Sequence, residues 1–116
     1  MPLKMTMEPQ EWLMIGATRV QNIHPEQAKF SIEGAAPVLR QAHTLTAVEA
    51  TTPAKRAYLA MQRLYLGLSD DHSEYRSAAA ELSREVPSSR ETVLRANIKL
   101  SKGATYGALR DLRSII

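Results

Sequence analysis

The sequence predicts an α+β fold, in which an antiparallel sheet of about five short strands precedes three to four packed α-helices. Apolar and polar residues alternate in short runs as far as about residue 40, and from Thr46 the apolar residues recur every three or four positions instead. The chain has 116 residues, which is enough to build a hydrophobic core without metal or disulfide. We therefore expect an antiparallel β subdomain at residues 1–45 and an α-helical subdomain at residues 46–116 that share one core.

Five strand signals occupy the first subdomain. In the first, Leu3, Met5 and Met7 alternate with polar residues, and Pro9 closes the run. The others are Glu11 to Ile15, Ala17 to Asn22 with Val20 facing inward, a run around Phe30 and Ile32, and a short strand at Val38 and Leu39. Because the connections are short, the strands are expected to pair antiparallel, in a sheet or a small barrel.

The first helix is predicted to begin at Thr52 and Pro53. A threonine hydroxyl can accept from a free N–H of the first turn, and the fixed φ of proline suits the first helical position. We expect one face of this helix to be buried and the opposite, cationic face to be solvated. The apolar face consists of Ala54, Ala57, Tyr58, Met61, Leu64, Tyr65 and Leu68, and the other face of Lys55, Arg56, Gln62 and Arg63.

Three further helices follow at short spacing. Ser69, Asp70 and Asp71 can cap a second helix that ends before Pro87, and its apolar face holds Tyr75, Ala78, Ala79, Leu82 and Val86. A capping box at residues 88–91 is predicted to open a third helix that stops at Gly103, with Val93, Leu94, Ile98 and Leu100 buried. A fourth helix starts near Thr105 and uses Tyr106, Leu109, Leu112 and Ile116. All six aromatic residues fit buried positions, so no row of exposed rings for base stacking is expected.

Composition and motifs argue against an enzyme. The chain has no cysteine, which excludes disulfides, thiolate catalysis and cysteine-ligated metals. Its three histidines are spread out without metal-ligand spacing, and the acidic residues 70, 71 and 74 fit a helix N-terminus, where the dipole stabilises negative charge. No nucleophile elbow or phosphate-cradling glycine loop occurs. We expect no catalytic residue, no metal and no cofactor.

The sequence also bears on localisation and charge. The longest apolar run, Trp12 to Ile15, is far shorter than the roughly 20 residues that span a bilayer, so a cytoplasmic protein without membrane association is expected.

Residues 1–50 carry four Lys/Arg against five Asp/Glu, whereas residues 51–116 carry eleven against seven. The excess of positive charge therefore belongs to the helical half, where it permits polyanion binding.

Three short segments carry a family resemblance. They read Thr-Thr-Pro-Ala-Lys-Arg-Ala-Tyr at residues 51–58, Met-Pro-Leu-Lys at 1–4 and Ala-Pro-Val-Leu-Arg at 36–40. Together they resemble the FlbT family of flagellin-synthesis regulators, most strongly over residues 1–68. The resemblance implies a protein that acts after transcription by binding the leader of flagellin messenger RNA, and that works with a second small protein, FlaF. The family usually has Pro-Gly-Glu where this chain has Pro9-Gln10-Glu11, so we expect a turn there that does not depend on a positive φ.

A second resemblance concerns the strands. Glu11 before an apolar strand that ends at Gly16, and Ala36-Pro37 before Arg40, are similar to the carbon storage regulator family, whose dimers hold messenger RNA between the first and last strands. Carried over, Lys4 and Thr6 match the first strand of that family and Arg40 matches its last arginine. The alternative is that Lys4 and Arg40 are ordinary charges that discourage edge-to-edge association.

The leading prediction is a non-enzymatic regulator that binds the 5′ leader of flagellin messenger RNA and controls its translation or stability. The contacts are expected from Lys4, Thr6 and Arg40 in the strands and from Lys55, Arg56 and Arg63 in the first helix. The alternative is a protein-binding module that docks FlaF or flagellin through its helices and does not touch RNA. Because the first strand has only Lys4 to charge its edge, self-association as a homodimer is also expected.

Overall fold

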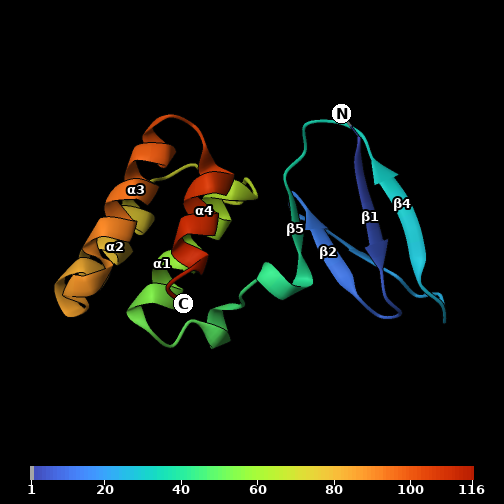
Figure 1. Cartoon of the computed structure of the whole chain (residues 1–116), viewed down its shortest axis with the longest axis horizontal. Coiled ribbons are helices and arrows are strands. Elements are labelled where there is room, and N and C mark those ends of the chain that lie inside the picture. Colours follow the sequence, from blue (N-terminus) through green and yellow to red (C-terminus); the bar gives the residue numbers. More distant parts are fainter. Residues whose placement is uncertain (1) are drawn as a thin grey trace. The chain divides into compact units, whose positions relative to one another are not determined.

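The protein, described here over residues 2–116 of a computed structural model, forms two compact units, Met1–Thr44 and Leu45–Ile116. The first unit contains five strands and the second contains four α-helices, which confirms the predicted α+β fold (Figure 1). A core shared by the two units stays a prediction.

The five strands form two sheets instead of the single sheet that was expected. Strand β1 (Leu3–Met7) pairs antiparallel with β4 (Ala28–Ile32), and β2 (Trp12–Ile15) lies between β3 (Thr18–Gln21) and β5 (Val38–Arg40), again antiparallel. In the two-stranded sheet Leu3 faces Ile32 and Met7 faces Ala28. The number of strands and their antiparallel pairing are as predicted, and the division into a two-stranded and a three-stranded sheet is the correction.

The core of the first unit is small. Met5, Met7 and Leu13 are buried together, with Ile15, Phe30, Ile32 and Val38 partly buried against them. Leu3 and Val20, predicted to face inward, are instead 46% and 37% exposed. Leu3 opens a sheet of only two strands, and Val20 lies on an edge strand whose four residues are all exposed, so neither side chain has a neighbouring strand on both sides.

The turn after β1 contradicts the expectation from Pro9-Gln10-Glu11. Gln10 adopts φ 69°, the left-handed region that glycine takes without strain. Backbone hydrogen bonds hold it there: Gln10 N–H donates to Asn22 O at 2.8 Å, and Asn22 N–H donates to Glu11 O at 2.9 Å. The Gln21 side-chain amide also donates to Gln10 O at 3.0 Å. The chain therefore keeps the glycine conformation with a glutamine in its place.

Asn22, which the sequence pattern did not single out, stabilises the same turn from inside. It is 7% exposed, and its Nδ2 donates to the carbonyls of Met7, Glu8 and Glu26 at 3.0–3.2 Å. Its Oδ1 accepts from His24 N–H at 3.0 Å. One buried amide thus joins the end of β1 to the loop before β4.

The helical unit begins as predicted. Helix α1 (Pro53–Tyr65) has Thr52 as its N-cap, with Thr52 Oγ1 accepting from Lys55 N–H at 3.1 Å. Helices α2 (Ser73–Glu85), α3 (Arg90–Ser101) and α4 (Thr105–Arg113) follow, and short 3₁₀ turns lie at η1 (Gln41–His43), η2 (Ala47–Glu49) and η3 (Pro87–Ser89). Helix α1 packs against both α2 and α4, and α4 packs against α3, whereas α2 and α3 share a smaller contact.

Several apolar residues predicted to be buried are exposed. The buried apolar residues of this unit are Ala57, Tyr58, Ala60, Met61, Leu66, Tyr75, Ala79, Leu82, Val93, Ala96, Ala108, Leu109 and Leu112. The exceptions are Leu68, Val86, Leu94, Ile98, Tyr106 and Ile116, which are 38–59% exposed. Leu68, Val86 and Ile116 lie beyond the ends of their helices, and Leu94 and Ile98 fall beside the line of Val93 and Ala96 that packs inward.

Of the two predicted caps of later helices, one forms. Asp71 Oδ1 accepts from Ser73 N–H at 2.9 Å and holds the start of α2, and this hydrogen bond lowers the pKa of Asp71. The capping box at residues 88–91 does not form, because Ser89 Oγ donates to Val86 O at 2.6 Å and the preceding residues turn as a 3₁₀ helix that leads directly into α3.

Gln62 was predicted on the solvated face of α1 and is 5% exposed instead. Its Nε2 donates to Leu45 O at 2.9 Å, while its Oε1 accepts from Leu45 N–H at 2.8 Å. Both ends of the amide are therefore satisfied, which removes most of the cost of burying it. This pair fixes the start of the helical unit to the middle of α1.

We predict that Gln10→Gly raises the free energy of unfolding by about 1 kcal/mol, because glycine adopts the left-handed conformation without the cost of a Cβ. The measurement is urea denaturation followed by circular dichroism. Gln10→Ala is the matched control, since it keeps the Cβ and should give no gain. A Gln10→Gly variant no more stable than Gln10→Ala would contradict the strain at this turn.

We predict that Gln62→Leu lowers the free energy of unfolding by about 1 to 3 kcal/mol, because both backbone groups of the half-buried Leu45 lose their partner. Gln27→Leu is a suitable control, since Gln27 is exposed and bonds only the exposed Glu8 side chain. Its effect is expected to stay within about 0.5 kcal/mol. Equal losses of unfolding free energy in the two variants would indicate that Gln62 lies on the solvated face of α1.

Tyr75 makes stability depend on alkaline pH. It is 1% exposed and donates to Asn97 Oδ1 at 2.8 Å, and burial raises the pKa of Tyr75 to about 12. Since the unfolded chain releases this proton near its ordinary pKa of 10, stability is complete below pH 10 and falls as the pH rises towards 12. We expect wild type to lose about 2 kcal/mol more than Tyr75→Phe between pH 9.5 and 11.5. The free energy of unfolding of both proteins is measured by urea titration at each pH. An equal fall with pH in the two proteins would show that Tyr75 does not cause this dependence.

Candidate functional site

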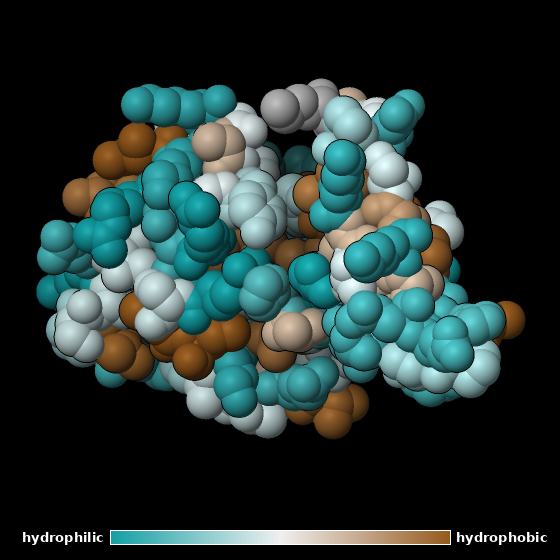
Figure 2. Space-filling model, turned by 45° about the vertical axis from the view of Figure 1, so that its right-hand side comes forward, coloured by the Kyte–Doolittle hydropathy of each residue, from teal (hydrophilic) through white to brown (hydrophobic). Residues whose placement is uncertain are grey.

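The structure supplies no membrane span or metal cluster within residues 2–116. No helix in this part of the chain is both long and apolar enough to cross a bilayer. No three His, Asp or Glu side chains of the same residues lie close enough to hold a metal ion. On the face shown in Figure 2, hydrophilic and hydrophobic residues are interspersed in small areas.

The three site residues predicted in the strands come together. Lys4 and Thr6 share one face of β1, and Arg40 reaches β1 from β5, where its Nη2 donates to Thr6 O at 3.1 Å. The same nitrogen lies 3.7 Å from Glu11 Oε2, and the Arg40 side chain is 44% exposed. Arg40 is thus held by a backbone carbonyl and one carboxylate, with part of its guanidinium open to solvent.

Lys29 belongs to this cluster, although sequence reasoning did not select it. The register places Lys29 directly opposite Thr6 and Ser31 opposite Lys4, so the two lysines lie diagonally across one face of the β1–β4 sheet. Together with Met5 and Phe30, these side chains line a shallow hollow of about 340 Å³. The pairing of β1 with β4, which brings Lys29 here, is not visible in the sequence.

Trp12 was predicted to be buried and is only partly so. The guanidinium carbon of Arg19 lies 4.1 Å from the centre of its ring, so the arginine of β3 covers the indole of β2. This is a cation–π contact between neighbouring strands. It explains how the ring is shielded without entering the core.

Two of the three basic residues predicted on α1 form ion pairs with α2. Arg56 Nη2 pairs with Glu81 Oε1 at 2.5 Å, and Arg63 Nε lies 3.6 Å from Glu74 Oε2. The members of the two pairs are seven residues apart on each helix, so they form successive ties along the α1–α2 contact. Lys55, half-buried at the start of α1, has no such pair with a carboxylate of residues 2–116. A role of these residues in RNA binding stays a prediction.

The helical unit keeps an excess of positive charge after its ion pairs are formed. Arg56, Arg63, Arg95 and Lys99 pair with carboxylates. Within the described residues, the cations of the unit without a carboxylate partner are Lys55, Arg76, Arg84, Arg90, Lys102, Arg110 and Arg113. Only Glu49, Asp70, Asp71 and Glu85 remain as carboxylates of this unit outside ion pairs, so its surface is cationic.

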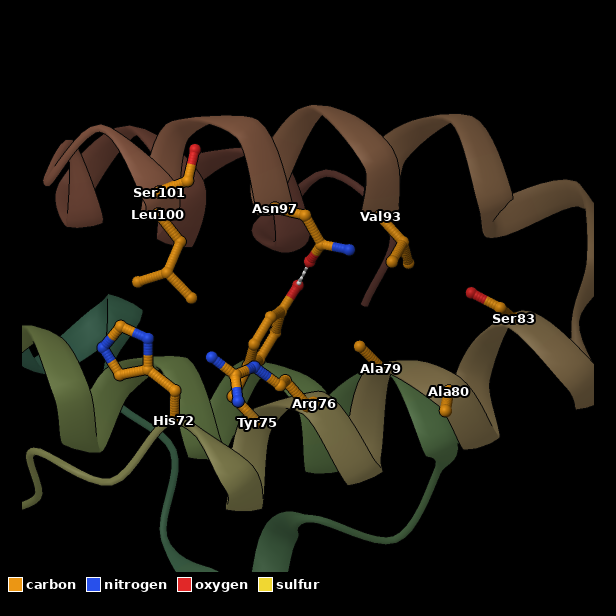
Figure 3. Close-up of a pocket in the computed structure, with 10 residues that line it drawn as sticks. All are labelled: His72, Tyr75, Arg76, Ala79, Ala80, Ser83, Val93, Asn97, Leu100 and Ser101. Atoms are coloured by element: carbon orange, nitrogen blue, oxygen red, sulfur yellow. Dashed lines mark hydrogen bonds between the residues drawn. The ribbon is translucent and has the colours of Figure 1, made fainter.

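A groove separates α2 from α3, where the two helices have their smaller contact (Figure 3). It has a volume of about 440 Å³, and its lining includes Ala79, Ala80 and Ser83 from α2 and Val93, Leu100 and Ser101 from α3. The hydrogen bond from Tyr75 to Asn97 crosses it. His72 and Arg76 lie along the α2 side, and the lining holds no carboxylate. The groove therefore combines small apolar side chains with basic ones.

Comparison with known proteins identifies relatives along the whole chain. A family model described as "Flagellar protein FlbT" matches residues 3–116. The probable flagellum biosynthesis repressor protein FlbT of Rhodopseudomonas palustris (strain TIE-1) is 38% identical over 118 residues, which cover 100% of this chain and 93% of that protein. The probable flagellum biosynthesis repressor protein FlbT 1 of Bradyrhizobium diazoefficiens is 33% identical over 119 residues, covering 100% of this chain and 81% of the relative.

A protein of Caulobacter sp. (strain K31), also named a probable flagellum biosynthesis repressor protein FlbT, is 31% identical over 83 residues, which cover 72% of this chain and 63% of that protein. No solved structure matches this chain. The similarity of the strands to the carbon storage regulator family stays a prediction. The match to the family model runs from the first strand to the last residue, and the relatives from Rhodopseudomonas palustris and Bradyrhizobium diazoefficiens match the whole chain, so this chain belongs to the FlbT family of flagellar proteins.

Proposed function

We propose that this protein is a cytoplasmic, non-enzymatic regulator of flagellin expression that binds the 5′ leader of flagellin messenger RNA and controls its translation or stability. Its relatives are named flagellum biosynthesis repressors, which supports a regulatory role in flagellar expression. The observation that carries RNA binding is the cationic surface of the helical unit, whose seven cations without ion pairs exceed the remaining carboxylates.

The two units contribute different kinds of contact. The unpaired cations of the helical unit attract phosphates of any sequence, because they act as point charges on a polyanion. Arg40 is different, since its guanidinium is oriented by Thr6 O and Glu11 and presents a planar fork that fits a phosphate or a guanine edge. Lys4 and Lys29 add charge on one face of the β1–β4 sheet, to which Arg40 is joined through the Thr6 carbonyl. In this scheme the helical unit supplies most of the affinity and Arg40 most of the sequence preference.

A second candidate function is favoured by the groove between α2 and α3. Such a groove is the usual binding place of an amphipathic partner helix, with apolar anchors inside and charges at the rim. Leu94 and Ile98 lie exposed on α3 and extend the apolar surface of that helix. The protein would then dock FlaF or flagellin, and its effect on expression would be indirect.

Binding of the flagellin leader to the purified full-length protein tests the proposal, with an unrelated RNA of equal length as reference. We expect Arg40→Lys to keep the affinity for the reference RNA and to lose about 1 to 3 kcal/mol of preference for the leader, because lysine keeps the charge and lacks the fork. Lys55→Ala is expected to weaken both RNAs and to lower the slope of log affinity against log salt by about 0.7. Arg95→Ala is the matched control, since Glu91 already pairs with that arginine.

The outcomes separate the two functions. Binding of the leader with this pattern supports the RNA-binding regulator. A wild-type protein that binds neither RNA, yet forms a complex with purified FlaF or flagellin that Arg76→Glu in the groove abolishes, would replace it by the docking function. Preference for the leader that is unchanged in Arg40→Lys would remove Arg40 from base recognition.

A further inference from the structure

We propose that Tyr65, Tyr106, Arg110 and Arg113 form a stacking platform for unpaired bases of single-stranded RNA, at the contact between α1 and α4. This inference rests on the proposed function and names a site on the protein that recognises unpaired strand. The exposed ring of Tyr106 departs from the expectation, drawn from the sequence, that all six aromatic residues are buried.

The aromatic part of the platform consists of two rings on neighbouring helices. Tyr65 ends α1 and Tyr106 lies in the first turn of α4, and their ring centroids are 5.3 Å apart with planes inclined at 51°. Tyr106 is 42% exposed, whereas Tyr65 is half-buried. Tyr65 thus supports Tyr106 from the side of the core, while part of Tyr106 remains open to a ligand. Exposed rings of this kind are the usual stacking surface for nucleobases.

An arginine is held beside the exposed ring. The guanidinium carbon of Arg113 lies 5.9 Å from the centroid of Tyr106, and its Nε donates to Tyr58 Oη at 3.4 Å. Tyr58 is fully buried, so it anchors the guanidinium from below. An arginine held next to an aromatic ring can contact two parts of a nucleotide, because its guanidinium stacks on bases and donates to phosphates.

The two charged side chains that share this side of α4 with Tyr106 are arginines. Arg110 lies one turn after Tyr106 on α4 and is exposed, and neither Arg110 nor Arg113 has an ion pair with a carboxylate among residues 2–116. The one acidic residue of α4, Asp111, pairs with Lys99 of α3 at 2.8 Å. An exposed ring flanked by two unneutralised arginines fits a stacked base between two phosphates better than it fits an apolar protein segment.

The test measures binding of a 5′-fluorescein-labelled 12-nucleotide oligouridylate, and of a 12-base-pair RNA duplex, to the full-length protein by fluorescence anisotropy. We expect Tyr106→Ala to weaken the single strand about fivefold or more, and the duplex less than twofold, because paired bases are not available for stacking. Tyr106→Phe keeps the ring and should restore the affinity to within about twofold. Circular dichroism and thermal melting verify that each variant is folded.

Two charge variants complete the design. Arg110→Ala is expected to weaken the single strand and to lower its salt slope by about 0.7, whereas Arg95→Ala, an arginine already paired with Glu91, should change the slope less. A wild-type protein that binds the oligouridylate, together with a folded Tyr106→Ala that binds it within twofold of wild type, would overturn the platform and leave the proposed function standing. Equal weakening of single strand and duplex by Tyr106→Ala would also overturn it. A wild-type protein that binds neither this probe nor the flagellin leader would overturn both.

Discussion

Helix α1 can bury only one side, and this limit determines where the helical unit places its charges. Ala57, Tyr58 and Met61 are fully buried, so the side chains that flank them must either reach a partner on the next helix or remain in water. Arg56 forms an ion pair with Glu81 of α2, and Arg63 forms one with Glu74. The side-chain amide of Gln62 forms hydrogen bonds with the backbone of Leu45. Because each ion pair removes one charge of either sign, the excess of positive charge in the sequence of this unit remains after pairing, and the proposed function depends on it.

The parts of the fold that were predictable from the sequence are those encoded by local patterns. The strand at Leu3–Met7 and the Thr52-Pro53 start of α1 depend on neighbouring residues alone, and the structure confirms both elements. The division of the strands into two sheets depends on which strands pair, and that involves residues far apart in the chain. Leu94 and Ile98 illustrate the same limit within a helix, because an apolar stripe wider than the neighbouring helix can cover leaves its outer residues exposed.

In the candidate site, too, local patterns predicted which residues lie together on one element but not their partners from distant parts of the chain. Choosing Lys4, Thr6 and Arg40 by resemblance selected residues that do lie together, since Arg40 bonds the Thr6 carbonyl. Helical periodicity placed Arg56, Gln62 and Arg63 on one face of α1 but could not reveal Glu74, Glu81 or Leu45 as their partners. Tyr106 was missed for a related reason. A tyrosine at an apolar position of a short helix is read as buried, and only the position of its neighbours shows how much of the ring remains open.

The turn at Gln10 also affects how this sequence can change over generations. Its left-handed backbone relies on hydrogen bonds with residues 21 and 22, and the Asn22 amide joins the same turn to the end of β1. With glycine at position 10, replacement of Asn22 would cost only the hydrogen bonds of its side-chain amide, which is a moderate loss of stability. With glutamine at position 10, the same replacement would add this loss to the cost of the left-handed backbone. Substitutions at these two positions are therefore expected to be coupled, and a glycine at position 10 makes replacement of Asn22 less costly.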